Sequence, residues 1–439
     1  DDSETGYFTA DRTDTKLKAT TGGALELVGK DDHTHCICGR TDCQETGTGH
    51  RKITCKGVSS LDLIKDSGSY YLLNDVTLTK TWKPNGGTLC LNGHAIHAAW
   101  KTAAIELKDT YITFNLTDCG TDGKVTGNIN SSGGVDEASG VVIGAKATFN
   151  LYNGSICDNT LYSYQTNLKA GAVEANGTFN MYGGSIKNNQ GTGWVSADSN
   201  YIGGVLVNST GKFTMTGGSI TGNKAKYGGG VWTGASFTVS GNVNITGNVG
   251  IDSKTASNVY PALVKITIGG EGLKQEAKIG VTRNTIDTGK HVTIATGAKD
   301  SCTADNFTAD AGEPYGIKVE RNGAYVDVNL YNGLPHEHPI CGKTCSHTDN
   351  EHTNIEWKPV SGLDEITEAG NYYLTQDVTS SKTWTCSSNV NLCLNGHSIT
   401  RNGDGNAINV TQNATFTLCD CNGSKAGNGK IIISSARYG

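Results

Sequence analysis

The segment from residue 171 to residue 248 alternates apolar and small polar residues with a period of two, which is typical of β-strands. Phe179, Met181 and Ile186 would point to one side, and Thr178 and Asn180 to the other. Gly-Gly and Asn-Gly pairs, which tolerate positive φ angles, break these strands into short pieces. Since no helical period separates the pieces, the pattern predicts an all-β fold.

The same sequence motif recurs with a spacing of between twenty and forty residues, and its copies begin at Phe149, Phe179, Phe213 and Phe237. Self-similarity at such a period is the signature of a solenoid. Three short strands and three corners per repeat predict one coil of a parallel β-helix, with Phe, Ile and Val stacked inside and each coil contacting only its neighbours. Asparagines follow the Ile strand where a corner is needed, and we expect their amides to bond between coils. They are Asn188, Asn189, Asn223 and Asn248.

A longer repeat of about 300 residues overlies the short one. The segment HTHCICG at His33 returns as HEHPICG at His336, and LCLNGHAI at Leu89 returns as LCLNGHSI at Leu392. A short helix with a nearby serine cap is expected at 60–64 and again at 362–366. The predicted parts are a tail of a preceding unit (1–32), a Cys/His-rich junction (33–58), a β-helix unit (59–335), a second junction (336–358) and the start of another unit (359–439).

The end of a solenoid exposes unpaired strand edges and a slice of core. A cap, a neighbouring unit or a head-to-tail partner must cover them. The sequence resembles a cut from a tandem array, so linear assembly with neighbouring copies into a fibre or filament is one expectation.

The motifs GxYYLxxDVTxxxTW, LCLNGHxI, xFxLxDC and xFxMxGGSIxxN occur in this order along the chain. In this combination the sequence resembles right-handed parallel β-helix modules of large surface proteins from gut Firmicutes, including clostridial adhesin-like tandem arrays. The resemblance covers nearly the whole chain. It implies a right-handed parallel β-helix and a stalk-like or adhesin-like role, although this fold also carries enzymes and inert spacers.

Composition narrows the partners and the compartment. The formal net charge is −6 and the basic residues are scattered, so nucleic acid is not an expected partner. No apolar run is long enough to predict a transmembrane segment. Fourteen cysteines in 439 residues favour an oxidising, extracellular or cell-surface setting.

Several cysteines recur between the long repeats in pairs, which we expect to be disulfides that clamp the first coils. The recurring pairs are Cys90–Cys119 and Cys393–Cys421. Two further pairs are expected, Cys386–Cys419 in the second copy only and Cys36–Cys55 in the first copy only. At the junctions, histidines and cysteines supply ligands of the kind that tetrahedral zinc prefers. The predicted structural zinc ligands are His33, His35, Cys38 and Cys43, repeated as His336, His338, Cys341 and Cys345. The alternative at each junction is a small disulfide loop with solvated histidines.

The sequence contains no carboxylate pair arranged for glycoside hydrolysis, so we name no catalytic residue and do not expect an enzyme. The candidate side chains for binding host or plant glycans are Trp194, Tyr201 and Trp232. We attribute the recurring His94 and His397 to corner positions. The function predicted is an extracellular structural or adhesin-like tandem-repeat protein, a rigid stalk or fibre subunit that presents a binding surface. The alternative is a carbohydrate-binding or polysaccharide-degrading β-helix.

Overall fold

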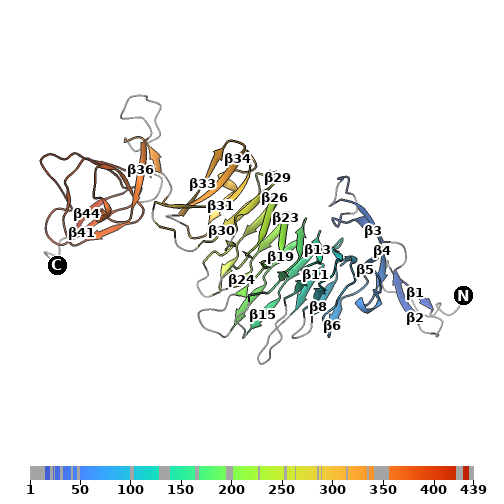
Figure 1. Ribbon diagram of the computed structural model, residues 1–439. Helices are drawn as coiled ribbons and strands as arrows, with labels where there is room; N and C mark the ends of the chain where they lie inside the picture. The colour runs from blue at the N-terminus through green and yellow to red at the C-terminus, as the bar shows by residue number, and fades with distance from the viewer. Residues whose placement is uncertain are drawn as a thin grey trace. The chain divides into compact units, whose positions relative to one another are not determined.

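The computed structural model describes most of the chain, with the strands forming parallel sheets (Figure 1). The described residues are 15–19, 23, 25–29, 33–40, 43–46, 50–98, 103–127, 139–163, 168–193, 201–225, 228–251, 255–262, 264–283, 286–287, 289–312, 315–333, 336–340, 355–421 and 429–434. The chain divides into two compact units. The first unit contains residues 1–283, 293–310 and 319–328, and the second contains 284–292, 311–318 and 329–439.

The largest sheet begins at the first Cys/His-rich junction and contains both the hairpin that will carry the site and the repeated strands. Its strands are β3 (His33–Cys36), β4 (Lys52–Val58), β5 (Ser69–Leu72), β6 (Val76–Leu78), β7 (Gly87–Cys90), β8 (Ala95–Ala98), β9 (Ile105–Leu107), β10 (Thr113–Thr117), β11 (Lys124–Gly127), β12 (Val141–Ile143), β13 (Thr148–Leu151), β14 (Ser155–Cys157), β17 (Val173–Ala175), β18 (Thr178–Met181), β19 (Ser185–Lys187), β22 (Val205–Val207), β23 (Lys212–Thr221), β25 (Val231–Thr233), β26 (Ser236–Thr246), β28 (Val259–Pro261), β29 (Ile266–Leu273), β30 (Lys278–Val281), β31 (His291–Ala298), β32 (Phe307–Ala309), β33 (Tyr315–Asn322) and β34 (Tyr325–Asn332).

Smaller sheets complete the description. An antiparallel hairpin joins β1 (Thr15–Ala19) and β2 (Leu25–Gly29). Two side sheets are β15 (Thr160–Ser163), β20 (Gln190–Gly193), β24 (Lys224–Ala225) and β27 (Val249–Gly250), and β16 (Lys169–Ala170) with β21 (Tyr201–Ile202). The second unit contains β35 (His336–His338), β36 (Ile355–Val360), β37 (Gly370–Leu374), β38 (Val378–Ser380), β39 (Trp384–Cys386), β40 (Val390–Cys393), β41 (Ile399–Asn402), β42 (Ile408–Val410), β43 (Phe416–Cys419) and β44 (Ile431–Ser434).

Each short repeat forms a rung, by which we mean a run of short strands that pairs in parallel with the corresponding strands of the next repeat. Thus β13 pairs with β18 and β18 with β23, which places Phe149, Phe179 and Phe213 in register. These phenylalanines are buried, and the Phe179 and Phe213 rings stack with centroids 4.7 Å apart. The alternating pattern therefore predicted the inward face correctly, and the all-β expectation is confirmed.

The asparagines after the Ile strands form a buried ladder along the rungs. The Nδ2 of Asn189 donates to Oδ1 of Asn223 over 2.8 Å, and Asn223 donates to Asn248 in the same way. Asn188, beside the ladder, has a φ of +58°. Both expected uses of asparagine, corner geometry and amide bonding between rungs, are confirmed here, and the ladder satisfies polar groups that burial would otherwise leave unpaired.

The two junctions fold alike in the two units. In the first, β3 pairs antiparallel with β4, which then pairs in parallel with β5, and the order continues through β7 and β10. In the second, the order is β35-β36-β37-β40-β43. The short helices expected near Ser60 and Gly362 are 3-10 turns, η2 (Leu61–Leu63) and η4 (Leu363–Glu365). A further 3-10 turn, η3 (Ala304–Asn306), lies near the end of the first unit. The Ser60 hydroxyl accepts a hydrogen bond from the Asp62 amide, as a cap does.

Candidate metal centre

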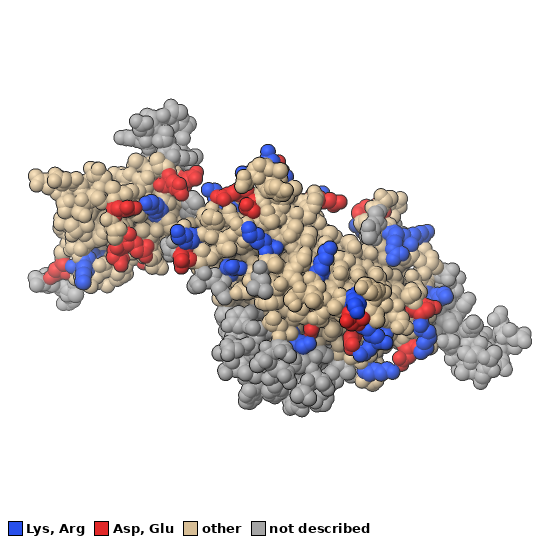
Figure 2. Space-filling model, in the orientation of Figure 1, with Lys and Arg blue, Asp and Glu red and all other residues tan. Residues whose placement is uncertain are grey.

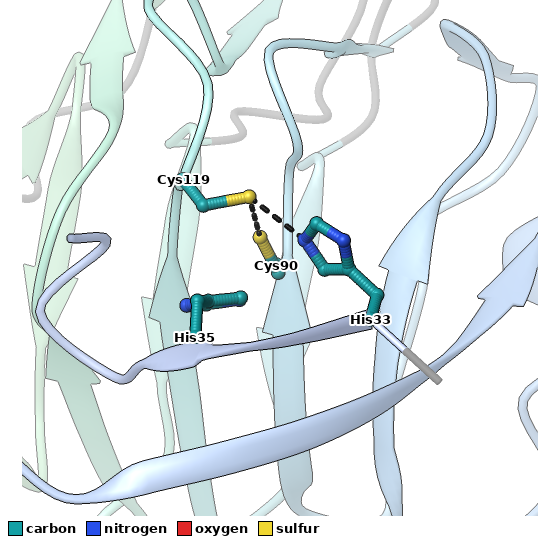
Figure 3. A group of neighbouring side chains, drawn as sticks. All are labelled: His33, His35, Cys90 and Cys119. Carbon is teal, nitrogen blue, oxygen red and sulfur yellow. Dashed lines mark hydrogen bonds between the residues drawn. The ribbon is translucent and has the colours of Figure 1, made fainter. Parts of the chain in front are cut away.

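Two histidines on β3 meet two cysteines at the ends of β7 and β10 (Figure 3). We call His33, His35, Cys90 and Cys119 the first buried quartet. Their ligand atoms all lie within 4.8 Å of one another. The His33 Nε2 lies 2.9 Å from Cys119 Sγ, and the two sulfurs are 3.3 Å apart. Side chains from three separate parts of the chain thus converge on one point.

Secondary structure explains this convergence. Since alternate residues of a strand share a face, His33 and His35 on β3 point to the same side, where Cys90 and Cys119 lie. Cys90 ends β7, and Cys119 follows β10, the neighbour of β7 in the parallel order. The hairpin lies over these strand ends, where Thr117 donates a hydrogen bond to the carbonyl oxygen of Ile37.

The protonation pattern of His35 suits a metal ligand. Its Nδ1 lies 2.5 Å from the carbonyl oxygen of Cys36, an acceptor that fixes the proton on Nδ1. The Nε2 atom is then left with its lone pair, and it is buried with no hydrogen-bond partner. An unpaired buried polar atom is costly in the absence of a ligand. A metal ion bound among the four side chains would remove that cost.

The second unit contains the same arrangement in the second buried quartet, His336, His338, Cys393 and Cys421. The His336 Nε2 lies 2.8 Å from Cys421 Sγ. The His338 Nδ1 lies 2.6 Å from the carbonyl oxygen of Pro339, and its Nε2 is again buried without a partner. The sulfurs of Cys393 and Cys421 are 3.4 Å apart. The orphaned nitrogen therefore occurs at the same place in both units.

Neighbouring sulfurs shift the pKa of a quartet cysteine in both units. The hydrogen bond from Cys90, with a further contribution from His33, lowers the pKa of Cys119 to about 5, while the pKa of Cys90 is raised. In the second unit, hydrogen bonds from the thiols of Cys419 and Cys421 lower the pKa of Cys393. A divalent cation would neutralise the negative charge of both thiolates, the form in which cysteine binds metals.

The predicted ligand set needs correction, because the structure divides it between two groups. His33 and His35 lie in the buried quartet, whereas Cys38 and Cys43 lie in a separate group with Cys36 and His50. The other two ligands of the quartet are Cys90 and Cys119, for which the sequence predicts a disulfide. Cys341 and Cys345, the corresponding predicted ligands of the second junction, lie outside the described residues.

The predicted disulfides also need correction, since these cysteines are free thiols in the structure. For Cys36 and Cys55 the reason is register: Cys55 lies opposite His33, while Cys36 lies opposite Lys52, so the two cysteines fall on opposite faces of the hairpin. Cys386 directs its sulfur to the carbonyl oxygen of Ser388 and not to Cys419. The pairs concerned are Cys90–Cys119, Cys393–Cys421, Cys386–Cys419 and Cys36–Cys55.

The three aromatic residues predicted to bind glycans differ in how the structure places them. Tyr201 is 2% exposed, so its ring is buried and cannot stack on a sugar. Trp232 packs against Ile202 and Leu206 but is only partly buried, and it stays a candidate. Trp194 lies outside the described residues. His94 contacts Asp75 through Nδ1 over 3.2 Å, next to Gly93 with its φ of +79°, which fits the corner position expected for it.

Comparison with known proteins does not assign this chain to a family. No protein-family model, curated protein or solved structure matches this chain.

Among the described residues, no helix is both long and apolar enough to cross a membrane. Basic and acidic side chains are mixed on the face shown in Figure 2.

Proposed function

We propose that the protein is an extracellular structural protein built from tandem right-handed parallel β-helix units, each locked at its first rungs by a structural zinc ion. The observation that carries the proposal is the recurrence of one buried quartet, with the same orphaned histidine nitrogen, at the start of both units. Parallel pairing of successive rungs and the stacked phenylalanines support the β-helix.

Zinc fits the quartet because two imidazoles and two thiolates are a common tetrahedral zinc set. Four protein ligands leave no open position for a substrate or an activated water, so the ion would serve stability and not catalysis. The histidine Nδ1 atoms donate to backbone carbonyls, which is the usual outer-shell arrangement for a ligating histidine.

The role of the zinc follows from where its ligands lie. The histidines belong to the hairpin that adds the first strand of the sheet, and the cysteines belong to the ends of later strands. The ion would tie these strands together where a solenoid otherwise frays and exposes its edge. Units capped in this way suit a rigid stalk or fibre that holds a surface away from the cell.

Metal analysis of the full chain, purified without chelators, tests this proposal. We expect bound zinc, and we expect a chelator with reductant to lower the thermal midpoint of the protein, with recovery on adding zinc back. A protein that contains no zinc, takes up none, and keeps its midpoint in chelator would contradict it. Electron microscopy then tests the fibre role, with end-to-end filaments as the expected product.

A second candidate function, carbohydrate binding, is favoured by a groove beside the first hairpin. Its volume is about 750 Å³, and its walls include Glu45, Glu271 and the partly buried Tyr182, whose ring stacks on the buried Tyr152. Aromatic faces and carboxylates are the groups with which proteins hold sugars. Immobilised mucins and plant polysaccharides should retain the protein, and Tyr182→Ala should weaken retention. Release of reducing or unsaturated sugar ends in the same incubation would instead indicate polysaccharide degradation.

A further inference from the structure

The loop between β3 and β4 brings together a second set of metal-type ligands. We call Cys36, Cys38, Cys43 and His50 the loop cluster. Their ligand atoms lie within 4.8 Å of one another, and His50 Nδ1 is 3.2 Å from Cys43 Sγ. Cys36 is buried and the other three are partly exposed. Cys36 ends β3, and the other three ligands lie in the loop that follows, whose described residues form no helix or strand.

The loop cluster is separate from the first buried quartet because of the pleat of β3. His33 and His35 share the face toward the sheet, so Cys36 points to the other face. A tight turn follows, in which the Cys36 amide donates to the carbonyl oxygen of Arg40 and the Gly39 amide donates to that of Cys36. This turn folds Cys38 back beside Cys36.

The turn is held against the sheet by a close backbone approach. Gly39 has a φ of +90°, and a Cβ at this position would lie 2.1 Å from the carbonyl oxygen of Asp118. Only glycine permits that contact. The first two cysteines of the loop cluster are therefore fixed by the fold before any metal binds.

The histidine of the cluster has an outer-shell partner. His50 Nε2 lies 3.0 Å from Glu45 Oε2, and Arg40 contacts the other oxygen of the same carboxylate over 3.3 Å. With its Nε2 proton donated to Glu45, His50 presents the Nδ1 lone pair toward Cys43. A carboxylate behind a histidine is a common feature of zinc sites, where it fixes the tautomer and the ring orientation.

We propose that Cys36, Cys38, Cys43 and His50 bind a second structural zinc ion, independent of the one in the first buried quartet. Three thiolates and one imidazole are a standard closed zinc set. The ion would organise the loop that forms one wall of the groove, since Cys38, Glu45 and His50 all line it. The rival chemistry is a disulfide within the cluster, which would leave the third cysteine and His50 unused.

Cobalt substitution of the full chain tests the proposal, because tetrahedral Co²⁺ absorbs visibly and its thiolate charge-transfer band grows with the number of sulfur ligands. We expect Cys38→Ser/Cys43→Ser to lose one equivalent of metal and the more intense part of that band. Cys90→Ser should lose a different equivalent, so failure of the first-quartet proposal and failure of this one are distinguishable. Cys157→Ser, a buried cysteine in neither cluster, is the matched control.

A conservative variant keeps the test informative where the double substitution fails to fold. Glu45→Gln leaves all four ligands in place and should weaken metal binding at one site by about 10- to 100-fold in a competition with a chromogenic chelator. Intact-mass analysis of the unreduced protein completes the experiment. Unchanged metal content in the double variant, or a mass deficit of two hydrogens mapped to the loop cysteines, would overturn the proposal.

Discussion

The two buried quartets have the same ligands in different surroundings. Behind the histidines, the first unit has Cys55 in a small apolar core. The second unit has Trp357 at this position, its ring stacked on His338 and its Nε1 donating to the His338 carbonyl oxygen over 2.9 Å. Beside the cysteines, Thr117 in the first unit is replaced by Cys419 in the second.

This comparison distinguishes the ligand residues, which both units share, from the packing residues around them, which differ. The packing residues are interchangeable, whereas the two imidazoles, the two sulfurs and the Nδ1-to-carbonyl bonds occur in both units. A purely apolar or disulfide-linked core would not need a histidine nitrogen left without a partner. The ligand set is therefore the common requirement, and variants that exchange residues between the two copies can test it.

Removal of one sulfur ligand is expected to have the largest effect. Cys90→Ser should cost the first unit about 4 kcal/mol or more, the size associated with losing a metal site. Cys393→Ser should do the same to the second unit only. Hydrogen exchange followed at β7 and β10, and separately at β40 and β43, measures each loss in its own unit.

The matched control for both variants is Cys302→Ser, because Cys302 is buried and belongs to neither the quartets nor the loop cluster. It should keep its full zinc content. Equal destabilisation by all three substitutions would point to ordinary packing of buried thiols and would remove the metal from the explanation.

An intermediate effect is expected at Gly39, which serves only the first unit. Alanine there would meet the Asp118 carbonyl oxygen and would hold a positive φ, at a cost of about 1–3 kcal/mol. The turn should lift from the sheet, so faster exchange is expected at the Ile37 amide while β40 stays unchanged. Thr117→Val, which removes the hydrogen bond to the Ile37 carbonyl oxygen, is the milder comparison, at about 1 kcal/mol.

The fold was largely predictable because the rungs repeat. Phe149, Phe179 and Phe213 occupy one register in the sequence and one register in the sheet, since period-two alternation determines which side chains point inward. Asn189 and Asn223 were predictable for a similar reason, because a repeated polar residue at a buried corner can pair with its own copy in the next rung.

The ligand set was only half predictable, because it depends on contacts between distant strands. His33 and Cys119 are 86 positions apart in the sequence, and only the parallel order of β4, β5, β7 and β10 brings them together. The long repeat did contain a signal that identifies the ligands. Cys90 and Cys119 recur together with His33 and His35, while Cys36 is replaced by Pro339 in the second junction and so cannot belong to the common site.

The smallest effect is expected from Cys419→Thr, which gives the second unit the residue that the first has at Thr117. Cys419 is a third sulfur close to Cys393 and raises the question of which sulfurs bind the ion. Since the zinc site proposed for the first quartet has two sulfurs, we expect the variant to keep its zinc and to change stability by no more than about 1 kcal/mol. Metal analysis of Cys419→Thr beside Cys421→Thr decides the matter. Loss of zinc from the first variant and retention in the second would mean that Cys419 is the ligand and that the two sites bind their ions differently.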